Sequence, residues 1–181
     1  MRVISGKYRG LNLVPFEGDD IRPTADRVKE SLFNILSYRV TGAVVADVFC
    51  GSGNLGIECL SRGAQEVYFN DLSKKSLEVL NKNLKKLKGG EKYRISRSDY
   101  LNFLGSTGAR FDLIFIDPPY RFDYGEPALK IIAERNLLNE GGAVVYERDR
   151  PFAGSSSGLE KYDERKYGKT YITFFSRGDV R

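Results

Sequence analysis

The chain has 181 residues, 41% of them hydrophobic and 29% charged, which is typical of one globular domain with its own core. It contains no histidine, so Ser-His-Asp and Cys-His catalysis are excluded, and its two cysteines, Cys50 and Cys59, cannot form a four-ligand zinc site. The net charge of +5 favours an anionic partner such as nucleic acid. No apolar stretch is long enough to span a bilayer and the first residues lack the apolar region of a signal peptide, so we expect a cytoplasmic protein.

Residues 1–40 are expected to form a small extension with a pattern of its own. Residues 2–15 alternate apolar and polar side chains around the turn sequence Gly-Lys-Tyr-Arg-Gly, which predicts a β-hairpin. A helix is then expected to begin at Pro23-Thr24, with Thr24 as a candidate N-cap and an apolar stripe at helical spacing. Residues 41–181 are expected to form the remainder of what is a single compact unit.

From residue 44 onward the pattern changes to strands alternating with helices. Apolar runs predict strands at 44–49, 67–71, 92–96, 111–116 and 142–146, and helical spacing predicts helices at 55–60 and 73–88. Two further strand-like runs, at 159–167 and 170–175, predict a terminal antiparallel hairpin. The expected fold is therefore Rossmann-like α/β, with a mostly parallel seven-stranded sheet and helices on both faces.

A glycine loop separates the first of these strands from the helix that follows it. The stretch "DVFCGSGNLG" contains Gly-x-Gly-x-x-Gly at Gly51, Gly53 and Gly56, which permits positive φ angles and a close approach of the backbone to a ligand. Such loops also occur as simple turns. Asp71, however, ends the next predicted strand about 20 residues further on, where a carboxylate can accept two ribose hydroxyl groups. Loop and acid together predict a nucleotide site.

Asp47, at the end of the first predicted strand, indicates which nucleotide to expect. A carboxylate that faces the loop disfavours a pyrophosphate and suits a cationic ligand, such as the amino group of S-adenosylmethionine. Asp99 follows the third predicted strand, where it can accept a hydrogen bond from the amino group of adenine, cap the next helix, or do both. Acids at the carboxyl ends of three strands favour a cofactor site over a plain turn.

Longer stretches of the chain resemble a bacterial family of methyltransferases. They are "RVISGKYRG", "IRPTADRVKESLFNIL", "DVFCGSGNLGIECLSRGA", "FDLIFIDPPY" and "RKYGKTYITFF", and together they extend over nearly the whole chain. They are similar to the class I S-adenosylmethionine-dependent methyltransferases that modify the exocyclic N2 of a guanine in small-subunit ribosomal RNA. The chain departs from that family in its short Gly/Ser loop at 151–158, which leaves little room for a helix between the fifth and sixth strands.

The resemblance implies a cofactor, a partner and a set of site residues. It implies S-adenosylmethionine as cofactor, and ribosomal RNA or an assembling ribosomal particle as partner, without a metal or a membrane. The cofactor residues are expected to be Asp47, Phe49, Gly51, Gly53, Gly56, Asp71, Leu72, Asp99 and Tyr100. Residues 1–40 are expected to contact RNA, with phosphates around a flipped guanine held by Lys7, Arg9, Arg22, Arg27 and Lys29. For any single one of these cations, a solvated surface charge paired with a carboxylate is an equal alternative.

The stretch "DPPY" supplies the expected catalytic residues, Asp117, Pro118, Pro119 and Tyr120. An exocyclic amine is a poor nucleophile, because its lone pair is conjugated into the ring of the base. Asp117 and the Pro118 carbonyl each offer an acceptor for one N–H, and the proline rings restrict the backbone that carries them. Tyr120 offers a face for base stacking, worth ~1–3 kcal/mol per base. The structural alternative is a simple Pro-Pro turn with Tyr120 in the core.

Other functions fit part of this pattern. Asp-Pro-Pro-Tyr also suits adenine-N6 methyltransferases of DNA or RNA, although a chain of 181 residues leaves little space for the target-recognition region that such DNA enzymes carry. A non-catalytic RNA-binding module with a degenerate nucleotide pocket is the alternative of another class, and the intact acids and glycines argue against it. An NAD-dependent oxidoreductase is disfavoured by Asp47. The sequence therefore predicts an enzyme of ribosomal RNA methylation.

Overall fold

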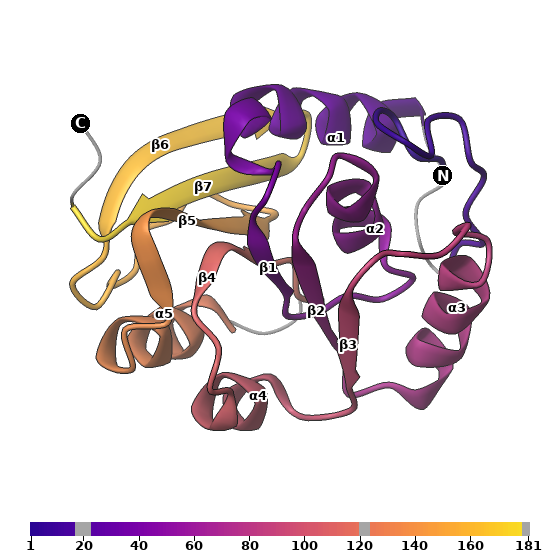
Figure 1. The fold of residues 1–181 in the computed structure, drawn as a ribbon. Coiled ribbons are helices and arrows are strands. Elements are labelled where there is room, and N and C mark those ends of the chain that lie inside the picture. The colour runs from indigo at the N-terminus through magenta and orange to yellow at the C-terminus, as the bar shows by residue number, and fades with distance from the viewer. Residues whose placement is uncertain (17–22, 120–123, 179–181) are drawn as a thin grey trace.

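A mostly parallel sheet forms the centre of the protein. The computed structural model describes residues 1–16, 23–119 and 124–178, with the backbone alone at 23–25. Within these residues the sheet has seven strands, in the spatial order β3 (Tyr93–Ser96), β2 (Glu66–Asn70), β1 (Val44–Asp47), β4 (Phe111–Ile116), β5 (Leu138–Arg148), β7 (Thr170–Ser176) and β6 (Glu160–Tyr167). The first five along the chain pair in parallel, and β7 runs antiparallel to β5 and β6 (Figure 1), so the predicted sheet and terminal hairpin are confirmed.

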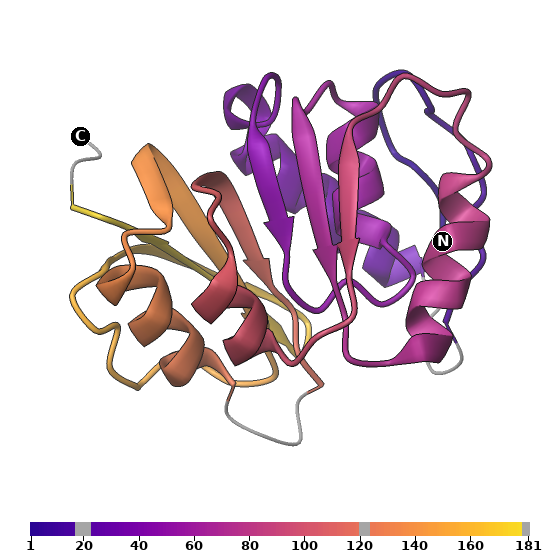
Figure 2. The same ribbon diagram turned by 60° about the horizontal axis from the view of Figure 1, so that its bottom comes forward.

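Helices cover both faces of the sheet (Figure 2). One face packs against α1 (Pro23–Ile35), α2 (Asn54–Ser61) and α3 (Lys74–Leu84), and the other against α4 (Tyr100–Ser106) and α5 (Gly125–Glu134). A short 3₁₀ helix, η1 (Ser37–Arg39), follows α1. In β4, Leu113 and Phe115 face the first group of helices and Ile114 and Ile116 the second, all of them fully buried. A strand buried on both faces explains why this stretch reads as a continuous apolar run. No described helix is long and apolar enough to cross a membrane.

A loop, and not a helix, follows β5. Residues 149–159, all described, contain no helix, which answers a question that the short Gly/Ser stretch left open. In place of a helix, the ring of Phe152 packs on the sheet. Its centroid lies 6.2 Å from that of Tyr146 and 4.9 Å from that of Phe175. Leu159 is buried in the same cluster.

Residues 1–16, the N-terminal segment, form the predicted hairpin as a short antiparallel pairing that packs along α2 and α3. Val3 N donates to Leu11 O at 3.0 Å, and Leu13 N donates to Met1 O at 3.1 Å. Among the described residues the only bridge in this segment joins Arg2 and Asn12. The alternation in the sequence arises because every inward side chain enters the core that α1, α2 and α3 share with the sheet. These buried side chains are Val3, Tyr8 and Leu13. The N-terminal segment and residues 26–40 therefore belong to the same packed unit as the other described residues.

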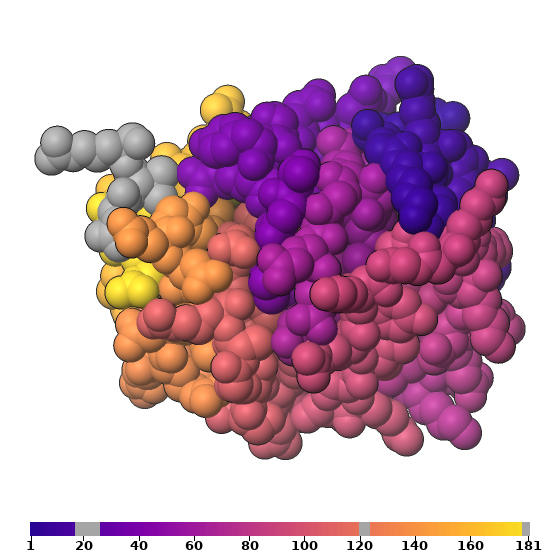
Figure 3. Space-filling view, in the orientation of Figure 1, coloured from indigo at the N-terminus to yellow at the C-terminus, as the bar shows by residue number. Residues whose placement is uncertain are grey.

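The tight turn of the N-terminal segment lies at the far end of α2 from the glycine loop. Gly6 has a φ angle of +83°, and a Cβ there would lie 1.9 Å from the carbonyl oxygen of Ser61, so only glycine fits. Lys7 N donates to that same oxygen at 2.7 Å. The segment also lies against the connection between α3 and β3 (Figure 3), where Lys7 Nζ is 2.7 Å from Glu91 Oε1.

Candidate active site

The strand register brings the predicted acids to one edge of the sheet. Asp47, the last residue of β1, is level with Phe69 of β2 and with Phe115 of β4. Asp71 and Asp117 come two residues after these, so they follow the two strands that flank β1. The strand order reverses between β1 and β4, and ligands of open α/β sheets bind outside the carboxyl ends of the strands at such a point.

Two of these carboxylates hold backbone amides of the glycine loop. Gly56 N donates to Asp47 Oδ2 at 3.0 Å, and Gly51 N donates to Asp71 Oδ2 at 2.9 Å. Ser73 N donates to the other oxygen of Asp71, at 2.8 Å. A carboxylate has about four acceptor positions, so Asp71 fixes the loop and retains capacity for hydroxyl groups of a ligand.

The three motif glycines have different roles. Gly53 has a φ angle of +85°, and a Cβ there would lie 2.4 Å from the Leu80 side chain, so both backbone and packing favour glycine. A Cβ at Gly56 would lie 2.2 Å from the Phe69 ring, so that position is set by the packing of α2 on β2. Gly51 has a φ angle of +52°, and a Cβ there would meet nothing within 4 Å. Gly51 is therefore the motif position where a ligand can approach the backbone.

Asp47 is a buried acid with a perturbed ionisation. Its side chain is almost fully buried, and this desolvation raises the pKa of the carboxyl to about 7. The hydrogen bond from Gly56 opposes the rise in pKa, and the neighbouring charge of Asp71 adds to it. A cationic group bound at Asp47 would offset the cost of burying its charge, which fits the amino group of S-adenosylmethionine.

The edge beside β2 has the polar and apolar groups that a nucleoside requires. The side-chain amide of Asn70 donates to Val48 O and to Ser98 O, each at 3.1 Å, and joins the ends of β1 and β3. Among the described residues, Asn70 Oδ1 is a buried oxygen with no hydrogen-bond partner. Leu72, directly after the predicted ribose acceptor, is 64% exposed and offers an apolar surface for a planar ring.

Asp99 is a helix cap in this structure. Its Oδ1 accepts a hydrogen bond from Leu101 N at 2.9 Å, so it forms the N-cap of α4, one of the two roles expected from the sequence. The carboxylate has further acceptor positions, and its predicted contact with an adenine amino group stays a prediction.

Three aromatic rings meet beside the glycine loop, and one of them belongs to no predicted motif. Phe49 follows β1, Tyr100 begins α4 and Tyr124 directly precedes α5, and their ring centroids are 5.2 to 5.5 Å apart. Phe49 and Tyr100 are among the cofactor residues expected from the sequence, whereas Tyr124 is not. The available signal was an aromatic residue at the start of a helix, close behind the Asp-Pro-Pro-Tyr stretch.

Asp117, Pro118 and Pro119 continue directly from β4, which ends at Ile116 as predicted. Val48 N donates to Phe115 O at 3.1 Å, so the chain remains joined to β4 where it leaves β1 for the glycine loop. Pro118 is buried and Pro119 is exposed. Tyr120 lies outside the described residues, and its predicted stacking role stays a prediction.

Lys29, one of the five predicted phosphate-binding cations, is buried. Its side chain is only 3% exposed, and its Nζ lies 3.1 Å from Glu58 Oε2. The same Nζ donates to Arg2 O at 2.6 Å and to Asn54 Oδ1 at 2.8 Å. Burial lowers the pKa of this ammonium, while Glu58 opposes that change. This placement contradicts the prediction that Lys29 binds phosphate, because its donors are already bonded inside the protein.

The other described cations of this prediction lie on two different elements. Lys7 and Arg9 belong to the turn at the far end of α2, about 12 Å from the glycine loop for an eight-residue helix. Arg27 is exposed on α1. Arg22 lies outside the described residues.

The turn between β6 and β7 carries cations at the same edge as Asp117. The register places Tyr171 of β7 two residues beyond the level of Ile116. Tyr171 is therefore level with Pro118, two strand spacings or about 10 Å away. Lys166 Nζ lies 5.2 Å from the centroid of the Tyr171 ring, and Lys169 in the turn is exposed.

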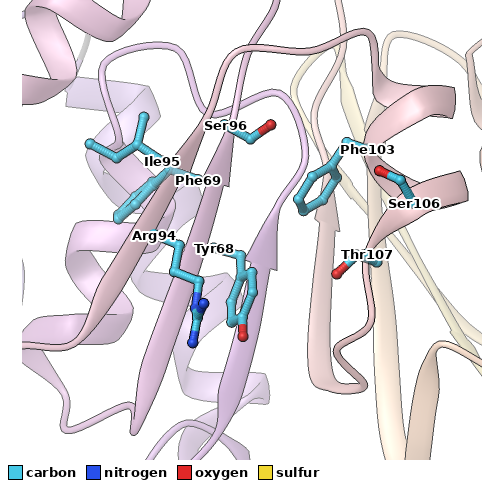
Figure 4. Close-up of a pocket in the computed structure, with 8 residues that line it drawn as sticks. All are labelled: Tyr68, Phe69, Arg94, Ile95, Ser96, Phe103, Ser106 and Thr107. Atoms are coloured by element: carbon cyan, nitrogen blue, oxygen red, sulfur yellow. The ribbon is translucent and has the colours of Figure 1, made fainter.

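A separate hollow of about 240 Å³ lies between β3 and α4 (Figure 4). The helix on one side of it, α4, has only seven residues. Arg94 lies over the Tyr68 ring at 5.3 Å and pairs with Glu66 at 2.9 Å. None of the predicted site residues lines it. Its lining residues are Tyr68, Phe69, Arg94, Ile95, Ser96, Phe103, Ser106 and Thr107.

The fold and this site together define a class of protein. The strand order, the glycine loop after β1, the acid after β2 and Asp-Pro-Pro after β4 are those of a class I methyltransferase. The chain belongs to the family described as "Conserved hypothetical protein 95", whose profile matches residues 1–176.

Individual relatives agree with this assignment. Ribosomal RNA small subunit methyltransferase D of Haemophilus influenzae is 39% identical over 157 residues, which cover 83% of this chain and 81% of that protein. The protein of the same name from Escherichia coli K12 is 34% identical, with coverages of 82% and 75%. A solved Escherichia coli structure titled "Putative methyltransferase yhhF" is 30% identical, covers 97% of this chain and 96% of its own, and has a TM-score of 0.86. The family resemblance read from the sequence is confirmed.

Proposed function

We propose that the chain is an S-adenosylmethionine-dependent methyltransferase that acts on the exocyclic N2 amine of a guanine in small-subunit ribosomal RNA. One observation carries this proposal: the glycine loop leaves β1 and Asp117-Pro118 leaves β4, and these two strands are paired neighbours. The names of the relatives supply the class of RNA. These relatives come from bacteria, in which ribosomal RNA lies in the cytoplasm, so we infer a cytoplasmic site of action.

The residues at the carboxyl edge fit the cofactor part by part. S-adenosylmethionine supplies a methyl group on a positively charged sulfur. Asp47 is placed to hold the cationic amino group, and Asp71 to accept the ribose hydroxyls. Leu72 and Asp99, which follow β2 and β3, are placed to contact the adenine. The remaining cofactor residues of the proposal are Phe49, Gly51, Gly53, Gly56 and Tyr100.

Asp117 and the Pro118 carbonyl orient the target amine. Each accepts one N–H, so the nitrogen lone pair is directed at the methyl group. The amine attacks as a neutral nucleophile, and no strong base is required beforehand. As the nitrogen–carbon bond forms and the carbon–sulfur bond breaks, the nitrogen becomes acidic and releases a proton to Asp117 or to water. Most of the acceleration then comes from positioning and electrostatics.

The RNA strand is proposed to enter over the turn between β6 and β7. Lys166, near the end of β6, and Lys169, in the turn, are exposed cations, and Tyr171 beside them is level with Pro118. Lys7 and Arg9 lie at the opposite end of α2, so any phosphates that they contact are remote from the target guanine.

Replacing Lys166 and Lys169 together by alanine should weaken binding of small-subunit ribosomal RNA at low salt. The plot of log affinity against log salt should become less steep by about one to two units, because each cation at a phosphate releases roughly one counterion. Filter binding across a salt series measures both effects. The pair Lys82→Ala and Lys85→Ala, two exposed cations at the C-terminal end of α3, is the matched control. Equal slopes for the two double variants would remove the β6–β7 turn from the RNA interface.

The function itself is tested by nucleoside analysis. The purified chain is incubated with methyl-labelled S-adenosylmethionine and either naked small-subunit ribosomal RNA or assembled small subunits, and the RNA is digested for mass spectrometry. We expect N2-methylguanosine. N6-methyladenosine would instead establish the adenine alternative. Cofactor binding without methylation of either substrate would overturn the proposal in favour of a non-catalytic RNA-binding module.

A further inference from the structure

We infer that Asn83 is a positioning residue for the cofactor loop and couples that loop to the N-terminal segment. The inference rests on the proposed function, because it takes the glycine loop to bind S-adenosylmethionine. Asn83 on α3 is fully buried, yet it belongs to none of the methyltransferase motifs. It lies between Ser52 of the glycine loop and Val14 of the N-terminal segment.

The side-chain amide of Asn83 is fully used as both donor and acceptor. Nδ2 donates to Ser52 O and to Val14 O, each at 2.9 Å. Oδ1 accepts from Val14 N at 2.7 Å. Exchanging the oxygen and nitrogen would set two donors against each other at Val14, so the contacts fix the orientation of the amide. No other side chain of this length offers the same combination, because aspartate lacks the donors and leucine lacks every polar group.

The bond to Ser52 matters because it fixes a peptide group of the loop from one side. On the other side of that peptide, Gly53 N donates to Cys50 O at 2.7 Å. The turn that contains the open backbone position is therefore held at its far end. The carboxylates at the ends of β1 and β2 hold the loop from the sheet, and Asn83 holds it from α3.

A second connection joins the N-terminal segment to the other end of the loop. Lys29 Nζ bonds both to Arg2 O and to Asn54 Oδ1, where Asn54 is the first residue of α2. Glu58 beneath it accepts hydrogen bonds from the amides of residues 4 and 5, at 2.8 and 3.0 Å. The N-terminal segment is thus anchored on both sides of the cofactor loop, so a change in its attachment at Asn83 alters the loop.

Asn83→Asp tests this role, because it keeps the acceptor for Val14 N and loses the donors to Ser52 O and Val14 O. By isothermal calorimetry we expect the affinity for S-adenosylmethionine to fall about 10-fold, in line with loss of the one buried hydrogen bond that Asn83 makes to the glycine loop. In methylation assays the KM for the cofactor should rise, while kcat at saturation stays within about twofold of the parent. Ser61→Ala is the matched control: Ser61 Oγ bonds the N-terminal segment at Tyr8 N (2.9 Å) and Ser5 O (2.6 Å), away from the loop. Loss of the Ser61 hydroxyl should lower the stability of the protein without changing its affinity for the cofactor.

Parental affinity in Asn83→Asp would overturn the inference, and so would an equal loss of affinity in Asn83→Asp and Ser61→Ala. A parent chain that binds no S-adenosylmethionine would instead remove the proposed cofactor and the inference with it. A second measurement needs no variant. Cofactor should slow the hydrogen exchange of the Val14 amide severalfold and leave that of the Tyr8 amide unchanged. An unchanged Val14 rate in a chain that binds cofactor would also contradict the coupling.

Discussion

Replacing Asp117 by alanine should lower single-turnover methyl transfer at least ~100-fold, the low end for loss of one preorganised electrostatic group. Cofactor affinity should be nearly unchanged, because Asp117 is assigned to the target amine and lies on the opposite side of β1 from Asp71. Asp117→Asn keeps an acceptor oxygen but loses the charge, so it should retain more activity than the alanine variant. Rapid quench with labelled cofactor and saturating RNA measures the chemical step.

Asp112→Ala is the matched control, since it removes a carboxylate from the start of the same strand. Asp112 Oδ2 accepts from Val44 N and Oδ1 from Asn139 Nδ2, each at 2.8 Å, so this variant should lose thermal stability. Once folded, it should methylate at the parental rate. If a folded Asp117→Ala protein methylates at the parental rate, the catalytic role of Asp117 is excluded and Asp-Pro-Pro is a purely structural turn. The same holds if both variants lose activity only in step with folding.

The parts of the fold that the sequence predicted well are those with a local physical signature. β4 matches its predicted run residue for residue, because a strand buried on both faces needs continuous apolar side chains. The N-terminal segment has alternating apolar residues for a different reason: its side chains are buried against α2 and α3. The alternation correctly predicted the hairpin, which is a short antiparallel pairing around the bridge between Arg2 and Asn12. It does not indicate that the buried side chains pack on helices instead of on a sheet.

The candidate site was predictable where residue type and chain position place a group, as for Asp47, Asp71 and Asp117 at strand ends. It was not predictable where burial decides the role. Lys29 has the charge of a phosphate ligand, but its partner Glu58 is 29 residues further along the chain and the pair is buried. Asn83 contacts Val14 across 69 residues, and no local pattern signals such a contact. These roles depend on tertiary packing.

Asp47→Asn should stabilise the ligand-free protein at neutral and alkaline pH. Burial raises the pKa of the folded carboxyl to about 7, against 3.8 in the unfolded chain. Between these values the unfolded chain has lost its proton and the folded protein has kept it, so the free energy of unfolding falls as the pH rises. For a shift of about three units the loss is at most about 4 kcal/mol, and it is complete above the folded pKa. Asparagine has no proton to lose, and its amide oxygen still accepts from Gly56 N.

Melting temperatures of parent and variant from about pH 4 to pH 9 measure this effect. The advantage of Asp47→Asn should grow as the pH rises toward 7 and remain constant above it. Cofactor binding should move in the opposite direction, because the variant lacks the charge that we assign to the cationic amino group. In the parent, the cationic amino group of the cofactor pairs with the ionised form of Asp47. Affinity for the cofactor should therefore decline as the pH falls below about 7, and binding should release a proton. The variant should show neither effect. A difference in melting temperature between parent and variant that stays constant with pH would show that Asp47 is ionised throughout this range. Parental cofactor affinity in the variant would exclude Asp47 from the site.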